Sequence, residues 1–196
     1  MPFSACCEFP AAQPTQAVIA AAGTAASTHA SREPITVGVL TVSDRASRGV
    51  YKDLSGPAVV AALPAREFTV VRTAVVPDDQ GAIVSALESW TGLCRVILTT
   101  GGTGVGPRDV TPEATARVIS RALPGVAEAM RRETLTAEPL ALLSRALCGV
   151  SRDGRAIVAN LPGSPAGAVQ CVGVLLPLLP RLVDLVAPAR DAAAPS

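Results

Sequence analysis

Short apolar runs rich in β-branched residues alternate with helix-like segments along most of this chain. Strands are predicted at residues 35–42, 68–76, 95–100, 147–150 and 156–161. Helices are predicted at 55–63, from the aspartates at 78–79 to 90, at 111–122, at 126–134, and from 165 to 186 with a kink at Pro177 and Pro180. Ser55 and Thr111 are the expected N-caps of their helices. The alternation predicts an α/β sandwich around a mainly parallel sheet, in which ligands bind at the carboxyl ends of the strands.

Composition narrows the class of protein. The 196 residues allow one ordinary domain, predicted at residues 34–188, with a disordered or weakly ordered N-terminal tail at 1–33 and a C-terminal tail at 189–196. Apolar residues make up 49% of the chain, which is enough for a substantial core. A net charge of +1 without a basic block argues against nucleic acid or an anionic membrane as the main partner. No apolar stretch is long and uniform enough to span a bilayer.

Histidine and cysteine usage excludes several kinds of site. His29 is the only histidine and lies in the predicted tail, so a Ser-His-Asp triad or a His-rich zinc site is excluded from the domain. The five cysteines are odd in number and show no C-x-x-C spacing, which argues against a disulfide framework. Cys94, Cys148 and Cys171 lie in apolar segments and are expected to be buried. We expect a reduced, cytoplasmic protein.

A glycine-rich stretch, TTGGTGVGPRDVTPE at residues 99–113, joins a predicted strand to a predicted helix. It is not a Walker A loop, because it has no lysine, and Pro107 occupies the place of the third glycine of G-x-G-x-x-G. Glycines nevertheless let the backbone approach a phosphate closely, and successive N–H groups can form an anion-binding nest. Four glycines in six residues exceed what a turn needs, which favours an anion site over a simple connection.

Asp109, in the same stretch, has two interpretations that the residues alone leave open. A carboxylate beside a phosphate repels it unless a cation lies between them, which suggests Mg²⁺. Alternatively, the carboxylate stabilises the start of the following helix through the helix dipole.

Six sequence blocks carry a resemblance to a known family. They are TVSDRASRGVYKDLSGP (41–57), VVPDDQ (75–80), LTTGGTGVGPRDVTPEAT (98–115), PGVAEAMR (124–131), LSRALCGV (143–150) and NLPGSPAGAVQC (160–171). With these blocks, residues 35–187 resemble the molybdenum cofactor biosynthesis domain of the molybdopterin adenylyltransferase family, which includes the bacterial Mog and MoaB proteins. The resemblance implies a three-layer α/β/α domain that is usually trimeric.

The resemblance also implies a reaction. The terminal phosphate of molybdopterin would attack the α-phosphate of ATP with the help of Mg²⁺, releasing pyrophosphate and leaving adenylylated molybdopterin. The product would then be ready for molybdenum insertion, which implies transient contact with a molybdenum-insertion protein. No side-chain nucleophile is needed, because such chemistry depends on positioning and charge neutralisation.

Residue roles carry over by motif position. Asp78 and Asp109 match the family's essential aspartates and would be both catalytic and Mg²⁺-binding. Arg45 and Arg108 would stabilise phosphate charge, and Ser164 would serve as a helix N-cap as well as a binding residue. The full set of expected substrate- or nucleotide-binding residues is Ser43, Asp44, Arg45, Asp53, Thr100, Gly101, Gly102, Thr103, Gly104, Arg108, Pro162, Gly163 and Ser164.

The family contains paralogues whose adenylylating activity is absent or unclear, and some of them lack the Arg-Asp pair of the RDVTPE block. This chain has Arg108 and Asp109, which favours the enzyme. The alternative is a non-catalytic, MoaB-like protein that binds or carries molybdopterin.

Overall fold

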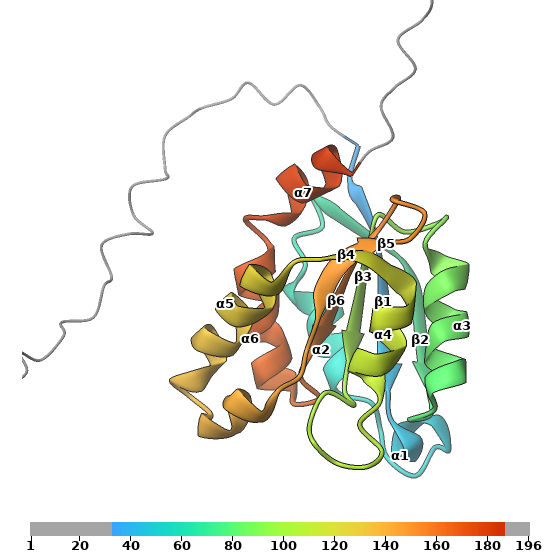
Figure 1. The fold of residues 1–196 in the computed structure, drawn as a ribbon, viewed down its shortest axis with the longest axis vertical. Coiled ribbons are helices and arrows are strands. Elements are labelled where there is room, and N and C mark those ends of the chain that lie inside the picture. The colour runs from blue at the N-terminus through green and yellow to red at the C-terminus, as the bar shows by residue number, and fades with distance from the viewer. Residues whose placement is uncertain (1–32, 187–196) are drawn as a thin grey trace, which may run out of the picture. The chain divides into compact units, whose positions relative to one another are not determined.

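The computed structural model describes residues 33–186, and the predicted tails, with His29, lie outside this range apart from Glu33. Six strands form one sheet in the order β2-β1-β3-β6-β5-β4 (Figure 1). Their bounds are β1 Ile35–Val42, β2 Phe68–Val76, β3 Val96–Thr100, β4 Ile119–Ala122, β5 Cys148–Ser151 and β6 Ile157–Leu161. β1, β2, β3 and β6 are parallel, whereas β5 pairs antiparallel with both β4 and β6. The mainly parallel sheet is as the sequence predicts.

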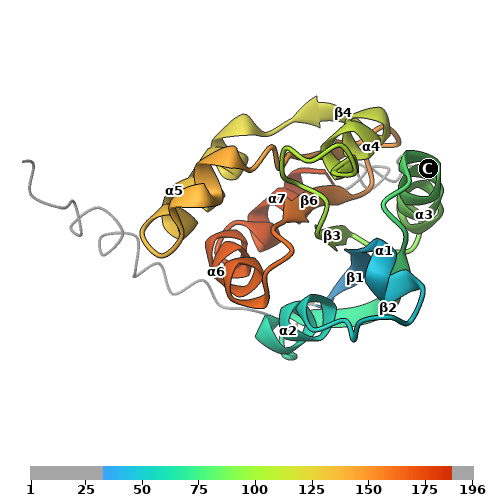
Figure 2. The same cartoon turned by 90° about the horizontal axis from the view of Figure 1, so that it is seen from below.

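Helices cover both faces of this sheet (Figures 1 and 2). α3 (Gln80–Trp90) and α4 (Thr111–Val118) pack together on one face. α2 (Ser55–Ala62), α5 (Pro124–Leu135) and α6 (Pro165–Leu175) cover the other, and α7 (Leu179–Leu185) adds to that layer. The short α1 (Asp44–Ser47) and the 3₁₀ helix η2 (Pro139–Leu143) lie in connections. The result is the expected three-layer sandwich.

Each sheet face has its own hydrophobic core, because successive strand residues point to opposite faces. In β3, Val96 and Leu98 pack beneath α2, α5 and α6, while Ile97 between them packs beneath α3 and α4. β6 alternates in the same way, with Ile157 on the first side and Val158 on the second. Strands buried on both faces explain the nearly continuous apolar runs in the sequence.

Residues 119–122 differ from the sequence prediction, which placed them at the end of the helix predicted at 111–122. The helix ends at Val118, and residues 119–122 form the edge strand β4. Pro124 disfavours helical geometry at the preceding residue. The backbone of β4 pairs with β5, which would otherwise be an open edge of the sheet.

The predicted helix over 165–186 is also divided. α6 ends at Leu175, and α7 begins at Leu179 after a bend of 59°. Pro177 lies at this break and cannot donate a backbone hydrogen bond, so the expected kink becomes a full interruption. Within residues 33–186 no single helix has the length and apolarity to cross a membrane; only the bent pair α6–α7, taken together, meets that test.

Two predicted N-caps are wrong, and the correct contacts matter for the site. Ser55 is the first residue of α2, and the cap is the carboxylate of Asp53, which accepts the N–H groups of Ser55 and Gly56, both at 3.0 Å. Thr111 is the first residue of α4, and its hydroxyl donates instead to the carbonyl of Gly101 at 2.9 Å. The side chains of Asp53 and Thr111 therefore brace the loops in front of these helices.

Candidate active site

The carboxyl ends of four parallel strands bring the predicted site residues to one edge of the sheet. Strand β3 leads into the glycine loop, residues 101–110, and β6 leads into the turn at 162–164. The loop after β1 and the turn after β2 lie at the same edge. Two cavities flank the glycine loop, one of about 660 Å³ and one of about 280 Å³.

The two cavities divide the predicted residues between them. The smaller cavity is lined by eight of them, namely Ser43, Arg45, Asp53, Asp78, Thr100, Gly101, Gly102 and Gly163. The larger cavity is lined by five, namely Thr103, Gly104, Asp109, Pro162 and Ser164. Asp44 and Arg108 line neither cavity and pair with each other beside them. Asp78 and Asp109, expected to work together, thus lie in different cavities.

The glycine loop requires glycine where it leaves β3. Gly101 and Gly102 have φ values of +100° and +63°, in the left-handed region that favours glycine. A Cβ at Gly101 would collide with the carbonyl oxygen of Val42 on the neighbouring strand. A Cβ at Gly102 would crowd the hydroxyl of Thr111 and would lie 3.2 Å from Oδ1 of Asp78. These glycines let the loop pass between the two cavities and close to Asp78.

Asp44 and Asp78 hold each other in place. The backbone N–H of Asp44 donates to Oδ2 of Asp78 at 2.7 Å, and the backbone N–H of Asp78 donates to Oδ1 of Asp44 at 3.2 Å. Burial raises the pKa of Asp78. The negative charge of Asp44 raises it further, and that of Asp109 makes the smallest contribution in the same direction. The carboxyl of Asp78 is therefore partly desolvated and positioned by α1.

Arg108 does not point freely into a cavity. Its guanidinium makes a bidentate contact with Asp44, with Nη2 at 3.0 Å from Oδ1 and 2.8 Å from Oδ2. The Arg108 side chain is 64% exposed, whereas that of Asp44 is 22% exposed. This hydrogen bond lowers the pKa of Asp44, so the carboxylate stays charged. Nε and Nη2 of Arg108 are occupied by Asp44, so only Nη1 offers donors to a phosphate in this arrangement.

Arg45 is the arginine that lines the smaller cavity. Its guanidinium lies 4.9 Å from the ring centroid of Tyr51, a cation–π contact, and both residues line the cavity. Asp53 lies further along the same loop, where its carboxylate accepts the hydroxyl of Thr41 at 2.7 Å. The hydroxyl of Thr41 and the N–H groups of Ser55 and Gly56 together occupy the carboxylate of Asp53, which therefore acts as the cap of α2.

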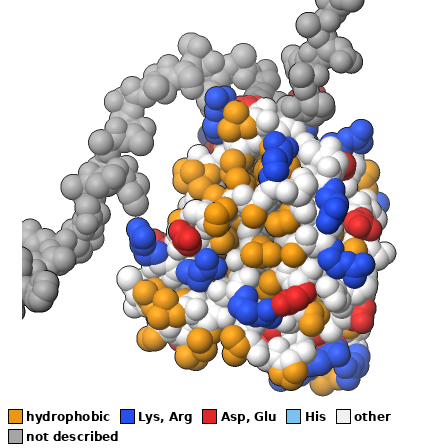
Figure 3. All heavy atoms as spheres, viewed as in Figure 1, with side chains coloured by type: hydrophobic (Ala, Val, Ile, Leu, Met, Phe, Trp, Pro, Cys, Tyr) orange, Lys and Arg blue, Asp and Glu red, His pale blue; other side chains and the backbone are white. Residues whose placement is uncertain are grey.

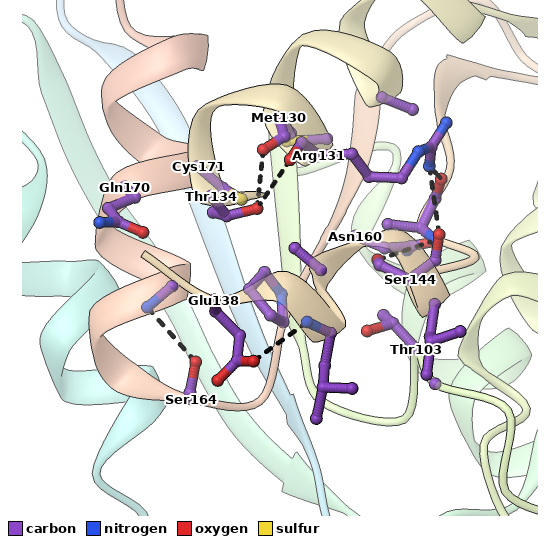
Figure 4. Close-up of a pocket in the computed structure, with 18 of the residues that line it drawn as sticks. Thr103, Met130, Arg131, Thr134, Glu138, Ser144, Asn160, Ser164, Gln170 and Cys171 are labelled. Atoms are coloured by element: carbon purple, nitrogen blue, oxygen red, sulfur yellow. Dashed lines mark hydrogen bonds between the residues drawn. The ribbon is translucent and has the colours of Figure 1, made fainter. Parts of the chain in front are cut away.

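The larger cavity lies between the glycine loop, α5, η2 and the start of α6 (Figure 4). Its wall is mainly small and apolar, with Met130 and Cys171 facing it from α5 and α6. Burial raises the pKa of the Cys171 thiol to about 12, so this cysteine is the buried hydrophobe that the sequence predicts. Ser164 caps α6 by accepting the N–H of Gly167 at 3.3 Å, as expected.

Asp109 lies in the larger cavity with its carboxylate turned back onto its own loop. Oδ2 accepts the N–H of Gly106 at 2.8 Å, and the N–H of Asp109 donates to the carbonyl of Gly106 at 3.0 Å. The carboxylate therefore closes the loop instead of accepting hydrogen bonds from the first turn of α4. This contact is compatible with both the Mg²⁺ interpretation and the helix-dipole interpretation of Asp109, which both stay predictions.

Two residues that the sequence did not single out organise the site. Arg145, in the connection between η2 and β5, donates to the glycine loop through its side chain and backbone. Asn160, buried in β6, donates from Nδ2 to the hydroxyls of Thr99 and Thr115. Both lie within motif blocks, but their roles depend on contacts with residues 32 to 61 positions away in the chain.

The carboxylates have limited capacity for a metal ion. Among residues 33–186, no group of three or more His, Cys, Asp or Glu side chains is arranged to hold one. Oδ2 of Asp78 and Oδ2 of Asp109 are engaged by backbone N–H groups, which leaves Oδ1 of each without a hydrogen-bond donor in the described part of the chain. One or two carboxylate oxygens together with substrate phosphates is a donor set that Mg²⁺ accepts.

Comparison with known proteins identifies the family. Residues 38–181 match the model of the probable molybdopterin binding domain. The chain belongs to this family. Its relatives include the molybdopterin adenylyltransferase of Helicobacter pylori strain J99, which is 39% identical over 158 residues, covering 79% of this chain and 89% of that protein.

Solved structures of this molybdopterin-binding family share the fold. The molybdopterin biosynthesis enzyme MoaB from Thermus thermophilus is 43% identical and superposes with a TM-score of 0.72, covering 78% of this chain and 96% of that one. The molybdopterin biosynthesis Mog protein from Mycobacterium ulcerans is 36% identical with a TM-score of 0.73, covering 78% and 99%. Mog and MoaB proteins are thus similarly close to this member of the family.

Proposed function

We propose that this protein is a molybdopterin adenylyltransferase. An oxygen of the terminal phosphate of molybdopterin forms a bond to the α-phosphorus of ATP, the bond between the α- and β-phosphates breaks, and pyrophosphate leaves. The observation that carries the proposal is the glycine loop itself, which forms a common wall of two cavities and has one carboxylate on each side, Asp78 and Asp109. Two substrates whose phosphates must meet fit such an arrangement.

The chain's own residues would mainly position the substrates and neutralise charge. The backbone of Gly101 and Gly102 allows a phosphate to approach without side-chain obstruction. Arg45 provides a cation at the smaller cavity. Asp78 and Asp109, on opposite sides of the glycine loop, would each offer an Oδ1 atom to Mg²⁺, which when bound would neutralise charge on the phosphate oxygens.

A second candidate is a non-catalytic protein that binds or carries molybdopterin. The chain is about as similar to a MoaB structure as to a Mog structure, and the similarity to MoaB favours this second candidate. It predicts binding of molybdopterin without formation of pyrophosphate, whereas the enzyme forms adenylylated molybdopterin and pyrophosphate in equal amounts.

One experiment separates these candidates. The full chain is incubated with molybdopterin, ATP and Mg²⁺, and single-turnover product formation is followed beside molybdopterin binding. Asp109→Asn should lower the rate a few hundredfold, or about 3–4 kcal/mol, because the amide keeps the hydrogen bond to Gly106 but loses the charge. Asp78→Asn should also slow turnover, and the double variant should be less than additive.

Asp79→Asn is the matched control for Asp78. Asp79 is the adjacent carboxylate, but it caps α3 by accepting the N–H of Ala82 and lines neither cavity. Asparagine is an equally good cap, so this variant should keep normal turnover. Near-normal turnover in Asp109→Asn would contradict the catalytic assignment, and molybdopterin binding without any product in the wild type would establish the carrier.

We also propose that the protein forms a closed trimer and passes its product in a transient contact to a molybdenum-insertion protein. Exposed leucines on η2, over which Figure 3 shows apolar side chains gathered, support an association surface beside the larger cavity. Sedimentation at micromolar concentration should show a trimer, and a monomer there would refute this part of the proposal.

A further inference from the structure

Arg145 makes four contacts with the segment from the glycine loop to the first turn of α4. Its Nε donates to the carbonyl of Gly104 at 2.7 Å, and its Nη2 donates to the carbonyl of Asp109 at 2.5 Å. Its Nη1 forms a hydrogen-bonded ion pair with Glu113 in the first turn of α4. Its backbone N–H donates to the carbonyl of Thr103 at 2.9 Å. The guanidinium therefore bridges both ends of the segment 104–109.

This bridge holds the part of the loop that carries Asp109. The Asp109 carboxylate lines the larger cavity and closes the turn from Gly106 to Asp109, and that turn lies between the two carbonyls that Arg145 holds. Arg145 itself does not line either cavity. Its influence on bound substrate would therefore pass through the loop and not through direct contact.

We propose that Arg145, oriented by Glu113, is a positioning residue that holds residues 104–109 in the conformation in which the Asp109 carboxylate serves the reaction. This inference rests on the proposed adenylyl transfer for its activity readout. Arginine suits the task because its planar guanidinium has donors in fixed directions, and here it contacts two carbonyls and a carboxylate at once. The compact ammonium of lysine could not maintain all three contacts.

The structure predicts a large effect on turnover and a small one on stability. Arg145 and Glu113 are 38% and 45% exposed, and ion pairs at such positions add little to folding. Loop geometry matters more for catalysis, where a misplacement of about 1 Å can cost on the order of a hundredfold in rate. Arg145→Met should therefore lower kcat about a hundredfold, with KM for ATP changed much less, and Arg145→Lys should fall between it and the wild type.

The matched control is Arg152→Met. Arg152 likewise donates from Nε to a backbone carbonyl, that of Arg117, but at the opposite end of α4, away from the loop. The Arg152→Met substitution should leave kcat unchanged. In the Asp109→Asn background, Arg145→Met should cause little further loss, because both changes act on the same carboxylate.

Hydrogen exchange of the full-length variants provides a readout that does not need activity. The amides of residues 103–106, 108 and 109 should exchange faster in Arg145→Met than in the wild type and in Arg152→Met. Unchanged exchange in this segment, or faster exchange with wild-type kcat, would overturn the inference. If the wild type forms no product, the proposed function fails, while the exchange comparison still decides whether Arg145 holds the loop.

Discussion

Replacing Asn160 with alanine should destabilise the protein strongly, although the residue carries no charge. Asn160 is fully buried in β6, and its side chain joins three other segments. Nδ2 donates to the hydroxyl of Thr99 on β3 at 2.9 Å and to the hydroxyl of Thr115 on α4 at 2.8 Å. Oδ1 accepts the N–H of Leu147 at 3.1 Å. Alanine removes all three hydrogen bonds at once.

The size of the effect follows from these contacts. Three hydrogen bonds at about 1 kcal/mol each, plus the penalty for the partly buried N–H of Leu147, which cannot rotate to another acceptor, give a loss of about 4 kcal/mol. For a domain of this size that corresponds to a fall in Tm of roughly 8–16 °C. The loss should exceed that of an exposed change, because solvent cannot readily replace the amide in a buried network.

Urea and thermal unfolding of Asn160→Ala measure this directly. Ser120→Ala is a suitable control, because its hydroxyl makes one hydrogen bond of 3.3 Å to the carbonyl of Ser151 and is exposed. It should cost less than about 0.5 kcal/mol. A loss below about 1 kcal/mol in Asn160→Ala would show that the groups left behind find other partners and would refute the reasoning.

Three further predictions concern backbone, thiol and charge. Gly101→Ala should destabilise the protein and impair substrate binding, because Gly101 has a positive φ and a Cβ there would meet the carbonyl of Val42. Gly173→Ala is the control, because a Cβ on α6 at this position meets open space. It should stabilise the protein by about 0.5–1 kcal/mol in urea unfolding. Cys171 should resist iodoacetamide at about pH 8 in the folded protein and react once it is unfolded, since burial raises its pKa to about 12; rapid alkylation of the native state would contradict this. The hydrogen bond from Arg145 lowers the pKa of Glu113 in the folded protein. The difference in free energy of unfolding between wild type and Glu113→Gln should therefore be largest above the ordinary glutamate pKa. It should vanish as the pH falls through the lowered pKa of the folded state.

The sequence by itself determined the elements whose signals are local. The apolar runs of β1, β3 and β6 are short and rich in β-branched residues, which indicates strands that are buried on both faces of a sheet. The glycine loop was also predictable, because the backbone at Gly101 and Gly102 adopts conformations that other residues rarely take. The parallel order then placed the loops that follow these strands at one edge of the sheet.

Only the tertiary structure decided how those loops meet. The pairing of Asp44 with Arg108 joins residues 64 positions apart, and the hydrogen bond from Arg145 to Gly104 joins residues 41 apart. Residues 119–122 became a strand because β5 offered them an edge, which no pattern within those four residues records. Asp78 and Asp109 came to line separate cavities because the loop that positive-φ glycines shape passes between them. Periodicity and turn chemistry are properties of neighbouring residues, whereas these contacts depend on which distant elements the packed sheet brings together.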